Sequence, residues 1–423
     1  MYYQTQLKNG IRVIAENIPH FRSISIGVWI GVGSANETKE NNGISHFIEH
    51  MLFKGTHSKS AKEIAAIMDG VGGQLNAFTA KECTCYYVKV MDEHTDLAFE
   101  LLSDMLLHST MDTNEIEKEK GVVLEEISMV EDSPEDLIHE LLAESFFNIH
   151  PLSFPILGYQ QNVRNFTRDD ILQYMNDYYT PNNIVISFAG NFERSHMEEK
   201  INRYFGDLLP NTYTQEQKID FIPKKSIFIR EKDTEQTHIC IGTPGISQAS
   251  NDEVYPLLIL NNLLGGSMSS RLFQKIREEK GLAYSVYSYP SQYKQTGMFT
   301  IYAGMKPSQS LEVIQLIFNE IYDVRTNGVK QDELSQAREQ LKGNFILGLE
   351  STSSRMSAIG KSLLLLNTIN SPTQIIEKIN SVTMNDLISV VEKVLDTRYI
   401  NIAVIGKTGS QVEIEKMIKL QGV

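Results

Sequence analysis

Along residues 23–32, hydrophobic residues alternate with a second set of positions that holds Ser23, Ser25, Gly27, Trp29 and Gly31. The hydrophobic positions are Ile24, Ile26, Val28, Ile30 and Val32. A period of two is typical of a β-strand that buries one of its faces. We therefore predict a strand here, in a sheet with one buried face.

Helical periodicity follows in longer stretches. It covers residues 96–108 and 114–130, and a further helix is expected to begin at Ser133, a good capping residue, with Pro134 in the first turn. Strands followed by helices are typical of α+β domains. The predicted fold class is therefore α+β, with helices packed on mostly antiparallel sheets.

The second half of the chain repeats the pattern of the first. Thr167 opens a helical stretch that leads to a strand ending at Gly190, and Thr383 opens one that leads to a strand ending at Gly406. Each pair lies 216 positions apart, which is about half of the chain. We therefore predict two related α/β sandwich domains that arose by internal duplication.

The length of 423 residues suits two domains of this size. The join between the domains is expected within residues 210–225, where residues 211–217 are polar and show no periodicity and Pro223 follows. The predicted domains are therefore residues 1–215 and residues 216–423.

Composition and charge exclude several classes of protein. Hydrophobic residues make up 41% and charged residues 22%, as in an ordinary folded protein. Lys and Arg number 39 against 53 Asp and Glu, and the net charge of −14 argues against a nucleic-acid partner and favours cationic ligands. No run approaches the roughly 20 apolar residues that span a bilayer, and the first residues lack the basic and apolar regions of a signal peptide. We expect a cytoplasmic protein without a membrane partner.

The three cysteines are too few for a disulfide framework, so we expect them to be reduced. They are Cys83, Cys85 and Cys240. Cys83 and Cys85 share one face of an apparent strand, and no second pair accompanies them. This pattern favours buried strand residues over metal ligands.

Residues 46–50, which read His-Phe-Ile-Glu-His, carry the strongest chemical signal. At about 100° per residue on a helix, His46, Glu49 and His50 fall within one narrow arc, and the hydrophobic residues beside them occupy the other side. Two imidazoles four residues apart can bind one divalent metal, and a neighbouring carboxylate can accept a proton from water. A surface helix with unrelated histidines would not explain these sorted faces.

A hydrolytic zinc ion usually has three protein ligands, so a third one is needed. The helical stretch 114–130 offers Glu119, Glu125 and Glu126. Glu119 and Glu126 lie seven residues apart and share a helix face, so one of them could bind the metal while the other orients a histidine. Spacing alone does not choose among the three.

With these residues identified, the chain resembles the inverted zinc-motif peptidases, the pitrilysin or insulinase family. Residues 46–56, His-Phe-Ile-Glu-His-Met-Leu-Phe-Lys-Gly-Thr, match the family signature almost residue for residue, with Ile48 in place of the commoner leucine. The two-domain branch looks closest, namely the bacterial processing proteases and the catalytic subunit of mitochondrial processing peptidase. The resemblance covers nearly the whole chain.

The resemblance implies a role for each residue of this set. His46, His50 and Glu126 would bind one Zn²⁺ per chain. Glu49 would act as the base. Glu119 would orient a ligand without binding the metal itself. The same donor set also accepts manganese or cobalt.

Residues 72–79 are similar to the edge strand to which substrates of this family add by backbone pairing. By this resemblance Asn76, Ala77 and Phe78 would bind the peptide. Without the resemblance, a glycine-rich turn leading into a hairpin would be the simpler interpretation.

In the second half, Arg277 and Tyr284 resemble the family's pair that contacts the substrate carbonyl. A guanidinium and a phenol can stabilise the oxyanion that forms as water adds to the amide. The metal set itself is missing from this half, where Asn344 stands at the place of Glu126.

The function implied is a zinc endopeptidase that hydrolyses short or unfolded peptides, preferably basic ones, inside a closed chamber. Larger relatives of the family build this chamber from four domains. A two-domain chain would therefore need a homodimer, in which Arg277 and Tyr284 of one protomer complete the zinc site of the other. The alternative is a non-catalytic assembly subunit of the same fold, but such relatives have typically lost the metal ligands that this chain keeps.

Overall fold

The computed structural model describes residues 2–209, 221–250, 252–407 and the single positions 413 and 416. By their internal contacts the residues form two compact units. The first combines residues 1–128, 154–218 and 346–371, and the second combines residues 129–153, 219–345 and 372–423.

The first unit contains a six-stranded sheet in which all neighbouring strands are antiparallel except β2 and β6, which are parallel. In spatial order the strands are β1 (Tyr2–Gln6), β2 (Arg12–Asn17), β6 (Ile184–Gly190), β3 (Ser23–Ile30), β5 (Thr84–Met91) and β4 (Gln74–Thr79). Strand β4 therefore forms one edge of the sheet.

Helices bury one face of this sheet in a large apolar core, to which each of them contributes side chains. They are α1 (Ile44–Met51), α2 (Ala61–Gly70), α3 (Thr95–His108), α4 (Thr113–Asp132), α6 (Gln160–Asn165), α7 (Arg168–Tyr178) and α8 (Arg194–Phe205). The helices predicted at 96–108 and 114–130 correspond to α3 and α4. Cys83 and Cys85 are buried at and beside β5, as predicted.

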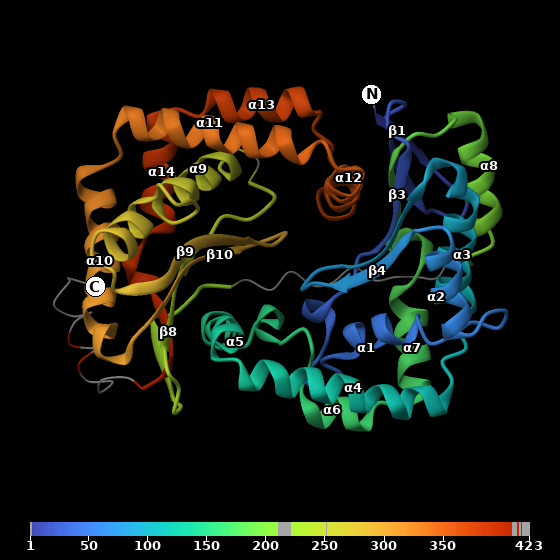
Figure 1. Cartoon of the computed structure of the whole chain (residues 1–423), viewed down its shortest axis with the longest axis horizontal. Helices are drawn as coiled ribbons and strands as arrows, with labels where there is room; N and C mark the ends of the chain where they lie inside the picture. The colour runs from blue at the N-terminus through green and yellow to red at the C-terminus, as the bar shows by residue number, and fades with distance from the viewer. Residues whose placement is uncertain (1, 210–220, 251, 408–412, 414–415, 417–423) are drawn as a thin grey trace. The chain divides into compact units, whose positions relative to one another are not determined.

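A helix from far along the chain, α12 (Thr352–Leu366), covers the opposite face of the same sheet. Met356 and Ile359 pack beside Trp29, and Gly360 permits this close approach because a Cβ there would lie 2.2 Å from the Trp29 Nε1 atom. Figure 1 shows α12 next to the strands of this sheet. Strand β3 is thus buried on both faces, and the expectation of one buried face is corrected.

The second unit contains a five-stranded sheet, again with a single parallel pair, β7 and β11. In spatial order its strands are β7 (Ser226–Glu231), β11 (Asn401–Gly406), β8 (Thr237–Pro244), β10 (Gly297–Met305) and β9 (Ala283–Gln292). Its helical elements are α9 (Val254–Leu264), the π-helical turn η5 (Phe273–Glu278), α10 (Ser310–Asn327), α11 (Gln331–Gly348), α13 (Pro372–Ser381) and α14 (Met384–Val394).

Helix α5 (Pro134–Phe147) packs on β7, β8 and β11 of this second sheet, although it comes from the first half of the chain. It begins at the predicted cap Ser133. His139 of α5 anchors it, with its Nδ1 atom 2.7 Å from the hydroxyl of Tyr289 on β9. Each sheet therefore takes one helix, α5 or α12, from the other half of the sequence.

The duplication is visible in both sheets, which share the order of their five matching strands. The two repeats also begin α7 and α14 alike, because Thr167 and Thr383 each cap their helix in a capping box. The α+β prediction is confirmed. The boundary between residues 215 and 216 lies outside the described residues and stays a prediction. Within the described part of the chain, no helix is long and apolar enough to cross a membrane.

Candidate active site

Helix α1 is fixed at its start by a buried carboxylate. Gly43, with φ of +100°, turns the chain into the helix. Glu37 accepts hydrogen bonds from the backbone N–H groups of Gly43 at 2.7 Å and of Ser45 at 2.8 Å. Backbone N–H groups at the start of a helix have no partner within it. The side chain of Glu37, which precedes α1 in the chain, therefore caps the N-terminus of α1.

The faces of α1 are sorted as the sequence predicts. Phe47, Ile48 and Met51 are fully buried in the core of the first unit. His46 and His50 lie on the other side, with ring centroids 4.5 Å apart. The helix therefore holds the two imidazoles at a fixed spacing.

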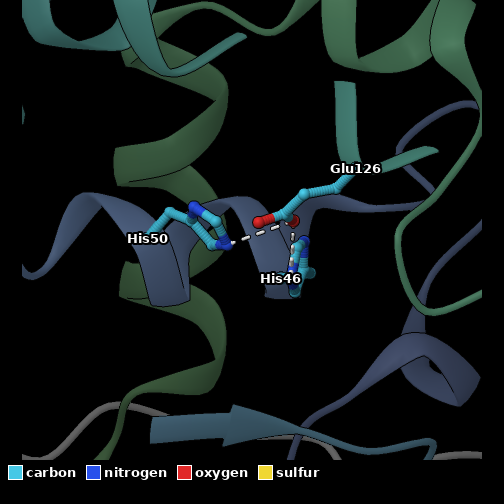
Figure 2. A group of neighbouring side chains, drawn as sticks. All are labelled: His46, His50 and Glu126. Carbon is cyan, nitrogen blue, oxygen red and sulfur yellow. Dashed lines mark ion pairs between the residues drawn. The ribbon is translucent and has the colours of Figure 1, made fainter. Parts of the chain in front are cut away.

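Glu126 of α4 completes a cluster with these two rings (Figure 2). Its Oε2 atom lies 3.8 Å from Nε2 of His46 and 3.6 Å from Nε2 of His50. Of the glutamates left open by spacing, Glu125 is exposed to solvent and lies outside the cluster. Among the described residues, this is the only group of three or more potential ligands that could hold a metal.

The arrangement fits a zinc ion. Bonds of about 2.0–2.1 Å to a tetrahedral zinc place neighbouring ligand atoms about 3.4 Å apart. The ligand atoms of the cluster all lie within 4.8 Å of one another. Two imidazoles and one carboxylate are also the donor set of catalytic zinc sites that keep a fourth position open.

Glu119 lies behind the cluster. It precedes Glu126 by seven residues, or two turns, on the same face of α4. Its Oε1 atom is 2.7 Å from Nδ1 of His50, and its Oε2 atom is 2.5 Å from Nζ of Lys54. The carboxylate is almost wholly buried. It therefore accepts the Nδ1 proton of His50 and leaves Nε2 as the nitrogen that faces Glu126.

Charges and burial shift the pKa values of these groups in different directions. Burial, assisted by the nearby His50, lowers the pKa of His46 to about 3. Burial also opposes the charged form of His50, but the hydrogen bond to Glu119 and the negative charges of Glu126, Glu119 and Glu49 together outweigh it and raise the pKa of His50. For Glu119 burial is likewise outweighed, here by the bonds from His50 and Lys54, and its pKa is lowered.

Glu49 links the helix to the edge strand. Its Oε2 atom accepts a hydrogen bond of 2.6 Å from the hydroxyl of Thr79, the last residue of β4. Burial raises the pKa of Glu49, and the Thr79 bond opposes this shift. A carboxylate of raised pKa beside a group of potential metal ligands is a suitable general base.

The three predicted substrate residues lie on β4, at the open edge of the sheet. Asn76 accepts a hydrogen bond of 2.8 Å from the backbone N–H of Ala77 through its side-chain oxygen. Phe78 stacks edge-on against Trp29 with ring centroids 5.7 Å apart. An edge strand of this kind can pair with an extended peptide.

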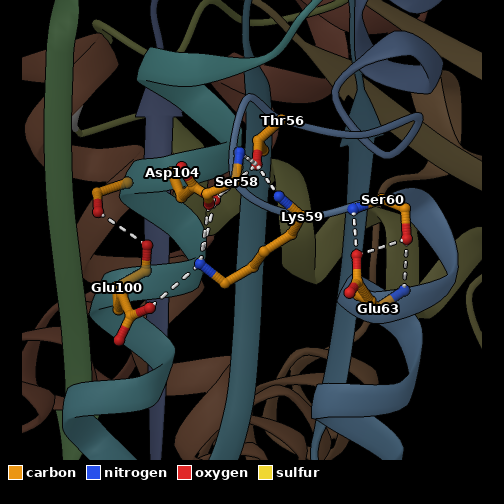
Figure 3. A network of polar contacts seen from close by, with 8 residues as sticks. Thr56, Ser58, Lys59, Ser60, Glu63, Glu100 and Asp104 are labelled. Atoms are coloured by element: carbon orange, nitrogen blue, oxygen red, sulfur yellow. Dashed lines mark hydrogen bonds and ion pairs between the residues drawn. The ribbon is translucent and has the colours of Figure 1, made fainter.

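The loop that joins α1 to α2 is attached to α3 by a network of polar contacts (Figure 3). Asp104 of α3 accepts hydrogen bonds from the side chains of Thr56 at 2.7 Å, Ser58 at 2.8 Å and Lys59 at 3.3 Å. Ser60 then caps α2. The network fixes the path of the chain from α1, which carries His46 and His50, to α2 and β4.

Arg277 of η5 and Tyr284 of β9 lie together in the second unit. The Arg277 guanidinium carbon is 5.7 Å from the centre of the Tyr284 ring, and both side chains are exposed. The two residues thus form one accessible pair, and their proposed action on substrate stays a prediction.

Two polar residues at the site were not singled out from the sequence. Lys54 follows His50 by four residues, a spacing that places both on one side of a helical path. Thr79 belongs to the same face of β4 as Ala77, which packs toward the core that α1 shares. The helical spacing of four from His50 leads to Lys54, and the strand spacing of two from Ala77 leads to Thr79. Both residues could therefore have been found from the sequence.

Comparison with known proteins agrees with this picture. The family model "Insulinase (Peptidase family M16)" matches residues 12–160, and "Peptidase M16 inactive domain" matches residues 165–341. An uncharacterised zinc protease of Bacillus subtilis is 48% identical over 378 residues, which are 89% of this chain and 91% of that protein. One from Streptomyces coelicolor is 38% identical, with 93% and 87% of the two chains covered.

Solved structures show the same fold. A protease from Helicobacter pylori superimposes with a TM-score of 0.88 at 24% identity, covering 96% of this chain and 99% of its own. A protein from Pseudomonas fluorescens, described as a peptidase M16 inactive domain, gives a TM-score of 0.91 at 20% identity, covering 97% and 99%. Fold and sequence matches together define a peptidase chain of two related halves. It belongs to peptidase family M16, the insulinase or pitrilysin family, which confirms the family resemblance seen in the sequence, whereas membership of the processing-peptidase branch stays a prediction.

The ion pair behind His50 leads to a testable expectation. Replacing Lys54 with methionine keeps the aliphatic stem and removes the charge that stabilises the buried Glu119 anion. We expect zinc affinity to fall by about tenfold, since changes to groups that orient a ligand cost on the order of 10- to 100-fold. Competition with a chromogenic chelator measures this. Lys62→Met, at an exposed position of α2, is the matched control, and equal affinities in the two variants would contradict the expectation.

Proposed function

We propose that this protein is a zinc-dependent endopeptidase that cleaves short or unfolded peptides. The observation that carries the proposal is the convergence of His46, His50 and Glu126, with Glu49 placed between this cluster and the open edge of β4. The complete donor set and base argue against a non-catalytic assembly subunit of the same fold.

The three ligands would hold one zinc ion through the two Nε2 atoms and the Glu126 carboxylate. A zinc ion held there supplies Lewis-acid chemistry, because it acidifies water and polarises a carbonyl. Glu119, kept charged by Lys54, orients His50 for this role.

Glu49 carries the proton. As a carboxylate it accepts the proton of the attacking water, and it then donates that proton to the amine that leaves. Thr79 holds one of its oxygens by a hydrogen bond, which fixes the carboxylate at the end of β4. A peptide paired along β4 would therefore reach Glu49 at the Thr79 end of the strand.

Substrate choice follows from backbone pairing and charge. Amide groups are common to all peptides, so pairing at β4 gives affinity with little sequence preference. The net charge of −14 favours basic peptides. Processing or degradation of such peptides in the cytoplasm is the role we assign to the protein.

We further propose that the active form is a homodimer. In it, Arg277 and Tyr284 of one protomer stabilise the oxyanion at the zinc site of the other, inside a closed chamber. Their joint exposure in the second unit supports this role, since both side chains are accessible to a substrate.

Metal removal tests the peptidase function. We expect purified protein to contain about one zinc per chain and to cleave an unstructured basic peptide, with activity lost after chelation and restored by stoichiometric zinc. Metal content is measured by mass spectrometry and cleavage by fluorescence. Cleavage that persists in the metal-free protein, or zinc-loaded protein that cleaves no peptide, would contradict the proposal.

A further inference from the structure

A cavity of about 490 Å³ lies beside the edge strand of the first unit. Ile64, Ala65 and Met68 of α2 form one wall, and Leu75 and Asn76 of β4 form another. Met68 lies four residues after Ile64 and three after Ala65, so the three side chains share one side of α2.

The cavity extends across the free edge of β4. Leu75 packs with the core beneath α1 and α2, whereas Tyr87, which also lines the cavity, packs on the side covered by α12. Tyr87 is the partner of Asn76 in the neighbouring strand. Since lining residues come from both faces of the sheet, the cavity occupies the place where one more strand would lie, about 4.8 Å from β4.

The position of the cavity relative to Glu49 sets which substrate residue it would meet. Glu49 is bonded to Thr79, at the far end of the strand. Leu75 precedes Thr79 by four residues, which corresponds to about 13 Å along a strand. A side chain that enters the cavity therefore belongs to a residue about four positions from the bond that is cleaved.

The lining decides the chemistry of that side chain. Ile64 and Met68 are buried at the base of the cavity, 2% and 3% exposed, and Leu75 adjoins them. Ala65 is small and exposed, which leaves space above this apolar base. The carboxylate of Asp69 lies on the same wall, so a basic side chain is the alternative that an experiment must separate.

We propose that this cavity is a specificity subsite that binds an aliphatic side chain, such as leucine, of the peptide paired with β4. The inference rests on the proposed peptidase function and deepens it. Endopeptidase cleavage by this protein then prefers peptides with an aliphatic residue about four positions from the scissile bond.

The test fills the cavity at Ala65 and compares the neighbouring position. Ala65→Phe places a ring in the cavity, and Ala66→Phe makes the same change at an exposed residue of α2 outside it. Substrates are one unstructured fluorogenic peptide with Leu, Lys, Asp or Gly four residues to either side of the cleavage site. For the wild type we expect kcat/KM with Leu to exceed that with Gly or Asp by about tenfold or more. Ala65→Phe removes this preference through KM, and Ala66→Phe retains it.

Binding separates this inference from the proposed function. The same peptides are titrated by fluorescence anisotropy against the Glu49→Gln protein with and without Ala65→Phe. Leucine-dependent binding that Ala65→Phe removes supports the subsite even if no peptide is cleaved, in which case only the peptidase function fails. A preference for Lys, the absence of any preference, or equal behaviour of the two phenylalanine variants would overturn the subsite.

Discussion

Replacing Glu49 with glutamine should lower kcat for peptide cleavage by about 10²- to 10⁴-fold while the protein still binds one zinc per chain. The amide matches the carboxylate in shape and can still accept the hydrogen bond from Thr79. It cannot take a proton from water at neutral pH, so the chemical step alone is lost. Initial rates and metal content, measured on the same preparation, check both parts.

Glu125→Gln is the matched control for this change. Glu125 is an exposed glutamate of α4, next to the ligand Glu126 but outside the cluster. Its variant should retain wild-type activity. Undiminished cleavage by Glu49→Gln would remove Glu49 from the mechanism, and loss of zinc from that variant would make it a ligand instead of a base.

Replacing Arg277 with alanine should lower kcat by about 10²- to 10³-fold, as expected when a donor to the oxyanion is removed. Mixing this variant with Glu49→Gln should then restore activity. If each site is built from two protomers, a heterodimer has one intact site, so random exchange at equal amounts returns about a quarter of the wild-type rate. Activity is measured after subunit exchange, which is followed by energy transfer between labelled protomers.

The result separates two arrangements of the site. When Arg277 acts on the zinc site of its own chain, no heterodimer contains an intact site and the mixture stays inactive. Exchange without recovery would therefore contradict completion of the site by a second protomer. A monomer that never exchanges would contradict the homodimer itself.

Much of the metal site could be predicted because it depends on local periodicity. His46, Glu49 and His50 lie on a single helix of two turns, so their common face follows from the sequence. The choice of Glu126 over Glu125 did not follow from spacing, because it depends on how α4 is rotated against α1. Only the family resemblance singled out Glu126 before the structure placed it beside the two imidazoles.

The helices α12 and α5, each of which covers a sheet of the other half of the chain, could not be predicted from local periodicity. Ser25 and Gly27 suggest a solvated face of β3, yet both are buried beneath α12, more than 300 residues along the chain. Contacts at such sequence separation leave no periodic signal. Trp29 in the polar register was the one local sign, since a large aromatic side chain on that face calls for apolar contact.

Because α5 of the first half covers the second sheet and α12 of the second half covers the first, neither half of the chain contains a complete domain. A polypeptide that ended after the first repeat would keep Trp29 but lack Met356 and Ile359, and so would present an apolar surface to water. The second repeat, made without α5, would lose the cover of its own sheet. The half without the metal ligands therefore supplies a helix that the half with the ligands needs to bury its sheet, whatever else it contributes to chemistry.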